Sequence, residues 1–469
     1  MRKLLVAGLM VVLSTPAFAA IQNVKVSGNI TTSFVHRNDF NLGTATGDLY
    51  TDGLKKQNVF LTQTEVRIDA DLSDNVSAQV GLINERAWNN GSGAATPTDQ
   101  GVNIYLANLT LREFLYSPLT LTIGRQVFYY GNGLILGNGP ANQTNGGLQF
   151  IAQDLGWSTA EDGIKATLDY KPLTIDLIYF KNDQKNLTGV LNNGGASSAN
   201  QSSEVFGYNA NYQLSDPWNT VVEQYLFSRV DEAGYTGNNK SNQLYVPGLR
   251  ASTNPIKGLN VQGEVAWQLG DNVVTANGGQ QAEKRDAMAI QALATYSLPV
   301  LPKYKPTVNA SYTYFSGDKM SATNGITGNK DARRYSAWDV FMGDYGAGTI
   351  YSSIYPLTNM NIISAGASVN PLEDLTAAFT WSNLWAAESY STNNPLQMYQ
   401  PTEGTELNTI PTRKDARGLG NEYDVNLTYN YTEDVTFGVS LGWYVPGSAL
   451  SNTNRDTASQ AIASLGVKF

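Results

Sequence analysis

The sequence has no cysteine and a single histidine, His36, in 469 residues. Without cysteine the chain forms no disulfide and binds no metal through thiolates. One histidine without a partner argues against a histidine-based catalytic triad and against a zinc site. We therefore predict no enzymatic activity, no metal and no cofactor. The composition leaves one alternative open, a carboxylate-only calcium site in the Asp- and Asn-rich loops.

Long hydrophobic runs are also missing. The only candidate, Leu4–Leu13, is too short to span a bilayer as a helix. It follows the charged start Met1-Arg2-Lys3 and precedes Ala17-Phe18-Ala19, a small-x-small cleavage pattern. These features predict a signal peptide at residues 1–19 and an exported mature protein at residues 20–469.

Charge is scarce, with 15% charged residues and a net charge of −9. An acidic balance argues against a nucleic-acid partner, which requires a basic surface. The chain is instead rich in small and aromatic residues, with Gly 44, Tyr 26 and Trp 8. Transmembrane β-barrels use aromatic residues at the two membrane interfaces and polar residues in the lumen and loops.

Alternation of apolar and polar residues recurs along the whole chain. In residues 460–469 the apolar set is Ala461, Ala463, Leu465, Val467 and Phe469, and the interleaved set is mostly polar. Residues 58–72 alternate in the same way. Between the alternating segments, short turn sequences and long polar loops follow one another along the chain. This pattern predicts an all-β fold, a single transmembrane antiparallel β-barrel of about 18 strands. A soluble β-sandwich is the alternative, but it does not require the repeated long loops.

The aromatic residue at the end of the chain, Phe469, resembles the ending of bacterial outer-membrane β-barrels, which their assembly machinery reads. This resemblance implies that the protein lies in the bacterial outer membrane. It also implies that Phe469 is an assembly signal and that the partners are outer-membrane lipid and the barrel-assembly machinery.

Three short motifs lie within residues 119–180. They are Gly124-Arg125-Gln126, Tyr130-Gly131 and Asp162-Gly163. Together they resemble the alginate-export family of outer-membrane proteins. The resemblance implies an eighteen-stranded barrel that passes polysaccharide or another solute outward.

Charged residues that alternate with the lipid-facing positions are the candidate pore-lining residues. They are Glu65, Arg67, Asp69, Asp71, Glu85, Lys165, Asp169, Asp176, Glu264, Arg285, Glu422, Asp424 and Lys468. Carboxylates outnumber basic side chains, and carboxylate rings favour cations. An alginate conduit would instead need a basic path, and Arg112, Arg229 and Arg250, whose strands have no clear alternation, are the candidates for one. The alternative for the pore-lining charges is that they pair across strands and only stiffen the wall.

Arg125 is an exception to this assignment, because it lies two residues after Ile123 and therefore shares the lipid face with it. A charge at the bilayer midplane is unfavourable by about 2–4 kcal/mol. We expect a bulge at Gly124 to turn Arg125 into the pore. The other possibility is that Arg125 lies at the headgroup level.

The longest loop, residues 317–358, is too apolar for a solvated surface loop, and we predict that it folds into the barrel mouth as a constriction. The candidate constriction residues are Arg333, Arg334, Tyr335, Trp338, Asp339 and Phe341. The sequence thus predicts an outer-membrane channel for passive export or diffusion of a hydrophilic solute or oligosaccharide, for example alginate. The alternatives are a general cation-preferring porin and a plugged structural or adhesive barrel.

Overall fold

The structure is a computed structural model. It describes residues 23–43, 55–88, 102–137, 155–156, 160–181, 203–232, 240–276, 279–318, 334–343, 348–390, 396–399, 407–410, 412–413 and 415–469. The predicted signal peptide lies outside these residues.

The first half of the chain forms strands β1 (Asn23–Asn38), β2 (Lys56–Ser73), β3 (Val76–Trp88), β4 (Asn103–Leu111), β5 (Leu119–Gln126), β6 (Glu161–Asp169), β7 (Leu173–Lys181), β8 (Ser203–Gln213), β9 (Val221–Asp231) and β10 (Asn242–Ile256). The second half forms β11 (Leu259–Ala276), β12 (Gly279–Arg285), β13 (Ala287–Ser297), β14 (Thr307–Phe315), β15 (Arg334–Tyr335), β16 (Met360–Leu372), β17 (Leu375–Ala386), β18 (Leu396–Tyr399), β19 (Leu407–Ile410), β20 (Gly418–Asn430), β21 (Val435–Pro446) and β22 (Ala458–Lys468). Among the described residues there are also the short helices η3 (Pro302–Tyr304) and α3 (Tyr351–Ile354).

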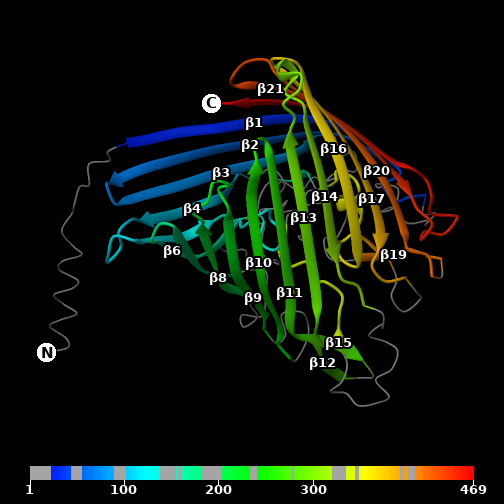
Figure 1. Cartoon of the computed structure of the whole chain (residues 1–469), viewed down its shortest axis with the longest axis horizontal. Helices are drawn as coiled ribbons and strands as arrows, with labels where there is room; N and C mark the ends of the chain where they lie inside the picture. The colour runs from blue at the N-terminus through cyan, green and yellow to red at the C-terminus, as the bar shows by residue number, and fades with distance from the viewer. Residues whose placement is uncertain are drawn as a thin grey trace.

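Neighbouring strands pair in antiparallel fashion around a closed wall. β1 pairs with β2 on one side and with β22 on the other, which closes the sheet (Figure 1). Of the 20 strands in this sheet, β12 and β15 extend only its rim, so the wall is an 18-stranded barrel. The prediction of a transmembrane antiparallel barrel of about 18 strands is confirmed.

Alternation of side chains across the wall explains why these segments form strands. On β2, Phe60 points outward with 48% of its surface exposed, whereas its neighbours Val59 and Leu61 point inward and are 2% and 5% exposed. An exposed apolar outer face suits lipid. Inward apolar residues are buried because segments of loop fold into the barrel and cover them.

Tight turns gather at one end of the barrel and long connections at the other, called here the turn end and the loop end. Residues 270–284 are largely a β-hairpin, since β11 pairs with β12 from Asp271 to Ala276. At the turn end, β10 continues through Pro255 to Ile256, and β11 begins at Leu259. Among the described residues, no helix is long and apolar enough to cross a membrane.

Candidate functional site: the filled barrel mouth

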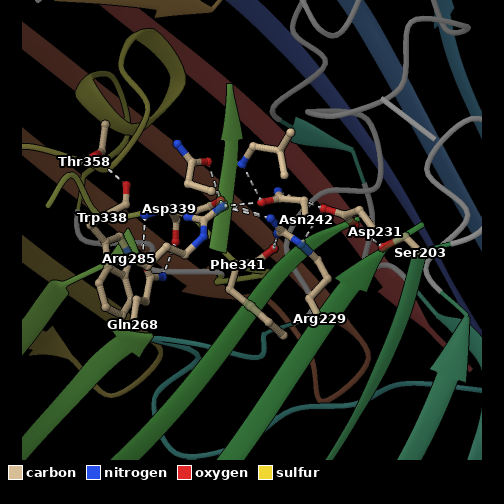
Figure 2. Close-up of polar contacts among 12 residues, drawn as sticks. Ser203, Arg229, Asp231, Asn242, Gln268, Arg285, Trp338, Asp339, Phe341 and Thr358 are labelled. Carbon is tan, nitrogen blue, oxygen red and sulfur yellow. Dashed lines mark hydrogen bonds and ion pairs between the residues drawn. The ribbon is translucent and has the colours of Figure 1, made fainter. Parts of the chain in front are cut away.

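The loop between β14 and β16 spans residues 316–359, and its described residues 338–343 and 348–354 lie inside the barrel, where a buried ion cluster holds them. Arg229 on β9 and Arg285 on β12 converge on the carboxylate of Asp339 (Figure 2). Arg229 donates to Asp339 Oδ2 at 3.1 Å, and Arg285 lies 3.1 Å from the same oxygen. The side chains of Arg229 and Arg285 are 11% and 1% exposed. Asp339 therefore joins the loop to the inner wall through two largely desolvated cations.

Main-chain contacts hold the same segment in place. The Gln268 amide donates to the Asp339 carbonyl at 2.6 Å, and the Asp339 N–H donates to Gln268 Oε1 at 2.8 Å. Trp338 donates its N–H to the Ser316 carbonyl at 2.9 Å. The polar backbone of a buried loop needs such partners. Gln268 thus satisfies both backbone groups of the residue that makes the ion cluster.

The ion cluster keeps the Asp339 carboxylate charged. Burial would raise its pKa, but the Arg229 and Arg285 guanidiniums outweigh burial and hold the pKa of Asp339 below its usual range. The anchor is therefore intact at neutral pH.

A second anchor lies on the opposite part of the wall, on β20. The carboxylate of Glu422 accepts backbone N–H bonds from Thr349 at 2.7 Å, Ile350 at 3.0 Å and Tyr351 at 2.6 Å. The next inward residue, Asp424, accepts a bond from the Thr349 hydroxyl at 2.6 Å. These bonds connect the β14–β16 loop to β20, whereas the ion cluster connects it to β9 and β12. The loop is therefore held at separate places on the wall.

The loop between β5 and β6 spans residues 127–160, and its described residues 130–136 join the β14–β16 loop inside the barrel. Leu136 forms a parallel bridge with Met342, and the Met342 N–H donates to the Ile135 carbonyl at 3.1 Å. Asn132 donates to Gln262 at 2.9 Å on the inner wall, and the Tyr130 hydroxyl donates to Asp176 at 3.0 Å. The two loops therefore form one inward-folded unit.

An apolar core seals this unit against the wall. It includes Leu134, Ile135, Leu136, Trp338, Phe341, Ile350, Tyr351 and Ile354 from the two loops. The wall residues that meet them include Val205, Phe227, Val246, Phe315, Ile362, Leu384, Leu419 and Ala458, which extend from β8 to β22. The loop-end half of the lumen is thus packed like a protein interior along this part of the perimeter.

Charged inner residues with access to water lie on β1–β7. Arg67 and Asp69 form an ion pair at 2.9 Å, with side chains 44% and 34% exposed. Asn29 donates to Glu65 at 2.7 Å, Tyr105 also donates to Glu65, and Gln63 donates to Glu85 at 2.8 Å. Paired cross-strand positions keep these groups on one face. This sector is a hydrated and mainly acidic wall.

The structure divides the predicted pore-lining residues into two groups. On the inner face of β2, β3, β6 and β7, with water access, lie Glu65, Arg67, Asp69, Asp71, Glu85, Lys165, Asp169 and Asp176. Lys468, on β22, is also exposed. The remaining four are buried, namely Glu264 at 7%, Glu422 at 0% and Asp424 at 3% exposure on the wall, and Arg285 at 4% on the rim strand β12. The expectation that these four line a water-filled lumen is wrong, because the inward-folded loops cover them.

The expectation for Arg125 is also wrong. Arg125 pairs with Ala107 in step with the Ile123–Leu109 pair, so no bulge turns it inward. It stays on the outer face, where it bonds Asp162 at 2.7 Å. The motif instead has a structural role: Gly124 and Gly163 pair, and the inward Gln126 amide donates to their carbonyls, at 3.3 Å each. A side chain at Gly124, with φ of +117°, would meet the Ala107 carbonyl.

Within the candidate constriction, Trp338, Asp339 and Phe341 are inside the barrel, and Tyr335 lies half-buried beside Arg285. Arg334 does not take part, because its side chain is 74% exposed at the rim and pairs with Asp286. Arg333 lies outside the described residues. Phe469 is on the outer face, where its backbone bonds Gly28 in both directions at the barrel seam.

Sequence reasoning missed Gln268, which looks like any other inward polar residue. It left Arg229, on a strand without clean alternation, as a candidate for a basic constriction and did not connect it with Asp339. The available signal was the acidic residue in an apolar loop, since a buried carboxylate requires a cationic partner.

Comparisons with known proteins agree with this architecture. The family model described as alginate export matches residues 23–464. Among solved structures, OccK11 (OpdR) from Pseudomonas aeruginosa has a TM-score of 0.54 at 10% identity and covers 96% of each chain. Pseudomonas aeruginosa OccK2 (OpdF), solved in complex with glucuronate, has a TM-score of 0.53 at 12% identity over 96% of this chain and 99% of that chain. A BenF-like porin from Pseudomonas fluorescens Pf-5 has a TM-score of 0.53 at 10% identity over 96% and 100%. No protein of curated function matches.

Proposed function

Because the chain belongs to the alginate-export family and is an outer-membrane channel for solute passage, we propose that it is a passive, cation-preferring channel for a small hydrophilic solute. The solute path follows the hydrated wall of β1–β7, beside the inward-folded loops. Passage follows the concentration gradient in either direction. The observation that carries this proposal is the separation of water-exposed carboxylates on β1–β7 from the buried charges under the loops.

The acidic wall supports cation preference. Glu65, Asp69 and Glu85 lie on adjacent strands β2 and β3 and point inward together. Carboxylates along a narrow aqueous path raise the local concentration of cations and exclude anions. Arg67 only partly offsets them, because it is already paired with Asp69.

Three of the basic side chains that the structure describes near the mouth are already paired and do not offer a path for a polyuronate such as alginate. Arg229 and Arg285 are paired with Asp339, and Arg250 is paired with Glu223. Their charges are thus engaged by fixed carboxylates. The solved neighbour that holds glucuronate shares the fold at 12% identity, which transfers no substrate to this chain.

Planar-bilayer recordings test the proposal. In a KCl gradient, the reversal potential should show preference for potassium, and the preference should weaken at high salt because screening grows. The double variant Glu65→Gln/Asp69→Asn should lose most of it, whereas Asp271→Asn, on the outer face of β11, should not. Anion preference in the unaltered protein, together with block by oligomers of uronic acid, would favour alginate export instead. Absence of any conductance would favour a plugged structural barrel.

A further inference from the structure

A row of alternating charges crosses four neighbouring strands on the outer face of the barrel. Arg125 on β5, Asp162 on β6, Lys181 on β7 and Glu204 on β8 are successive register partners. Arg125 pairs with Asp162 at 2.7 Å and Lys181 with Glu204 at 3.5 Å. We call these four residues the outer charge row. The channel function makes no use of them, because they point away from the lumen.

The lengths of these strands fix the height of the row in the membrane. β5, β6 and β7 have 8, 9 and 9 residues. A tilted strand needs about 9–11 residues to cross the hydrocarbon layer. The row lies at the loop-end limit of each strand, within one residue of its last or first position. Barrels of this class have short periplasmic turns and longer extracellular loops, so the row at the loop end is at the headgroup level of the outer leaflet.

An exposed apolar row lies directly beneath the charges. It consists of the register partners Ile123, Ile164, Tyr179 and Phe206, which are 42%, 42%, 39% and 41% exposed. The Tyr179 hydroxyl reaches up to Glu204 at 3.0 Å. Lipid acyl chains contact this apolar row, so the group that lies beside the charges above it is the headgroup of the same lipid.

The alternation of signs identifies the chemistry of that headgroup. A purely basic patch would select an anion alone, but this row has as many carboxylates as cations. Asp162 and Lys181 remain 55% and 56% exposed despite their pairing. Arg125 and Lys181 can contact phosphate oxygens, while Asp162 and Glu204 can contact a divalent cation through oxygen ligands.

We propose that the outer charge row is a binding site for the phosphorylated lipid of the outer leaflet, with a divalent cation bridging lipid phosphate and the carboxylates. The site fixes this side of the barrel, where the wall is shortest, to the surrounding leaflet.

Native mass spectrometry of the purified full-length barrel in neutral detergent tests this proposal. The probes are a bisphosphorylated glycolipid and the same lipid with its phosphates removed, each with Mg²⁺ or with EDTA. The unaltered protein should retain the phosphorylated lipid in Mg²⁺ and bind the dephosphorylated one about tenfold less. EDTA should reduce retention of the phosphorylated lipid.

Two variants and a control separate the contributions. Arg125→Gln/Lys181→Gln should lower retention about tenfold, and Asp162→Asn/Glu204→Gln should remove the dependence on Mg²⁺. Lys284→Gln is the matched control, because Lys284 forms the same kind of outer pair with Asp271 but on the long β11–β12 hairpin beyond the membrane. If Arg125→Gln/Lys181→Gln fails to fold, Lys181→Gln alone serves, since Lys181 is outside the Gly124-Arg125-Gln126 motif of β5. Equal retention of both lipids, equal retention by all folded variants, or a protein dimer in place of bound lipid would overturn the proposal.

Discussion

Replacing Asp339 by asparagine tests whether the β14–β16 loop is latched by its ion cluster. The carboxylate contacts two guanidiniums, and an amide leaves both without their shared counter-ion while presenting an NH₂ group to one of them. Removing one partner of a buried ion pair is unfavourable by about 3–5 kcal/mol.

The lower end of that range applies here. Arg229 keeps Asp231 at 3.5 Å and the Phe341 carbonyl at 3.3 Å, and Arg285 keeps Asn242 and Asn272 at 3.2 and 3.1 Å. A loss of about 3 kcal/mol corresponds to about a hundredfold shift toward the detached loop. The Gln268 contacts and the Glu422 anchor remain, so the loop detaches transiently and the barrel stays folded.

Single-channel recordings should therefore show that Asp339→Asn spends about a hundredfold more time in a state of higher conductance. Arg334→Gln is the control, because Arg334 belongs to the same loop but its exposed ion pair with Asp286 contributes only about 0–1 kcal/mol. Recordings of Asp339→Asn that match those of the unaltered, correctly folded protein would refute the idea that the ion cluster latches the loop.

The remaining predictions concern pH, the second anchor, the loop and assembly. Because the pKa of Asp339 is lowered in the folded protein, the charged carboxylate stabilises the attached loop at any pH above the usual Asp pKa, and this stabilisation is lost as the pH falls through the lowered pKa. Channel openings of the unaltered protein should therefore increase below about pH 4. An equal increase in Asp339→Asn would exclude this carboxylate as the cause. Glu422→Gln replaces one of two carboxylate oxygens that accept backbone bonds from residues 349–351 and should lower stability by about 1–3 kcal/mol, read as a lower melting temperature on semi-native gels, with Glu373→Gln in an exposed turn unchanged. Deleting residues 325–350 should raise conductance and admit larger solutes, and an unchanged size limit in a folded deletion would place the loop outside the solute path. Deleting Phe469 should leave export intact and sharply reduce the heat-modifiable barrel in the outer membrane; normal barrel levels would show that it is not an assembly signal.

The strand pattern could be predicted from sequence because alternation is a local property. On β22, Leu465 and Val467 share the outer face with Phe469, and Ser464 and Lys468 take the inner one, as expected from their order along the chain. The two-residue repeat of a strand fixes the face of a side chain without reference to any other strand. The same repeat gives Glu65, Arg67 and Asp69 one common face of β2, opposite to that of Phe60.

Which inner residues meet water was decided only by the tertiary structure. Asp69 and Glu422 both face inward on strands with regular alternation, yet Asp69 is half-exposed and Glu422 is fully buried. The difference arises because residues 349–351, distant in sequence, fold onto β20 and not onto β2. Arg125 shows the same limit, since its charge suggested the lumen while the strand register kept it on the outer face beside Asp162. Sequence periodicity determines the face of a residue, whereas its solvent and its ion partner depend on contacts between distant segments, which local pattern does not encode.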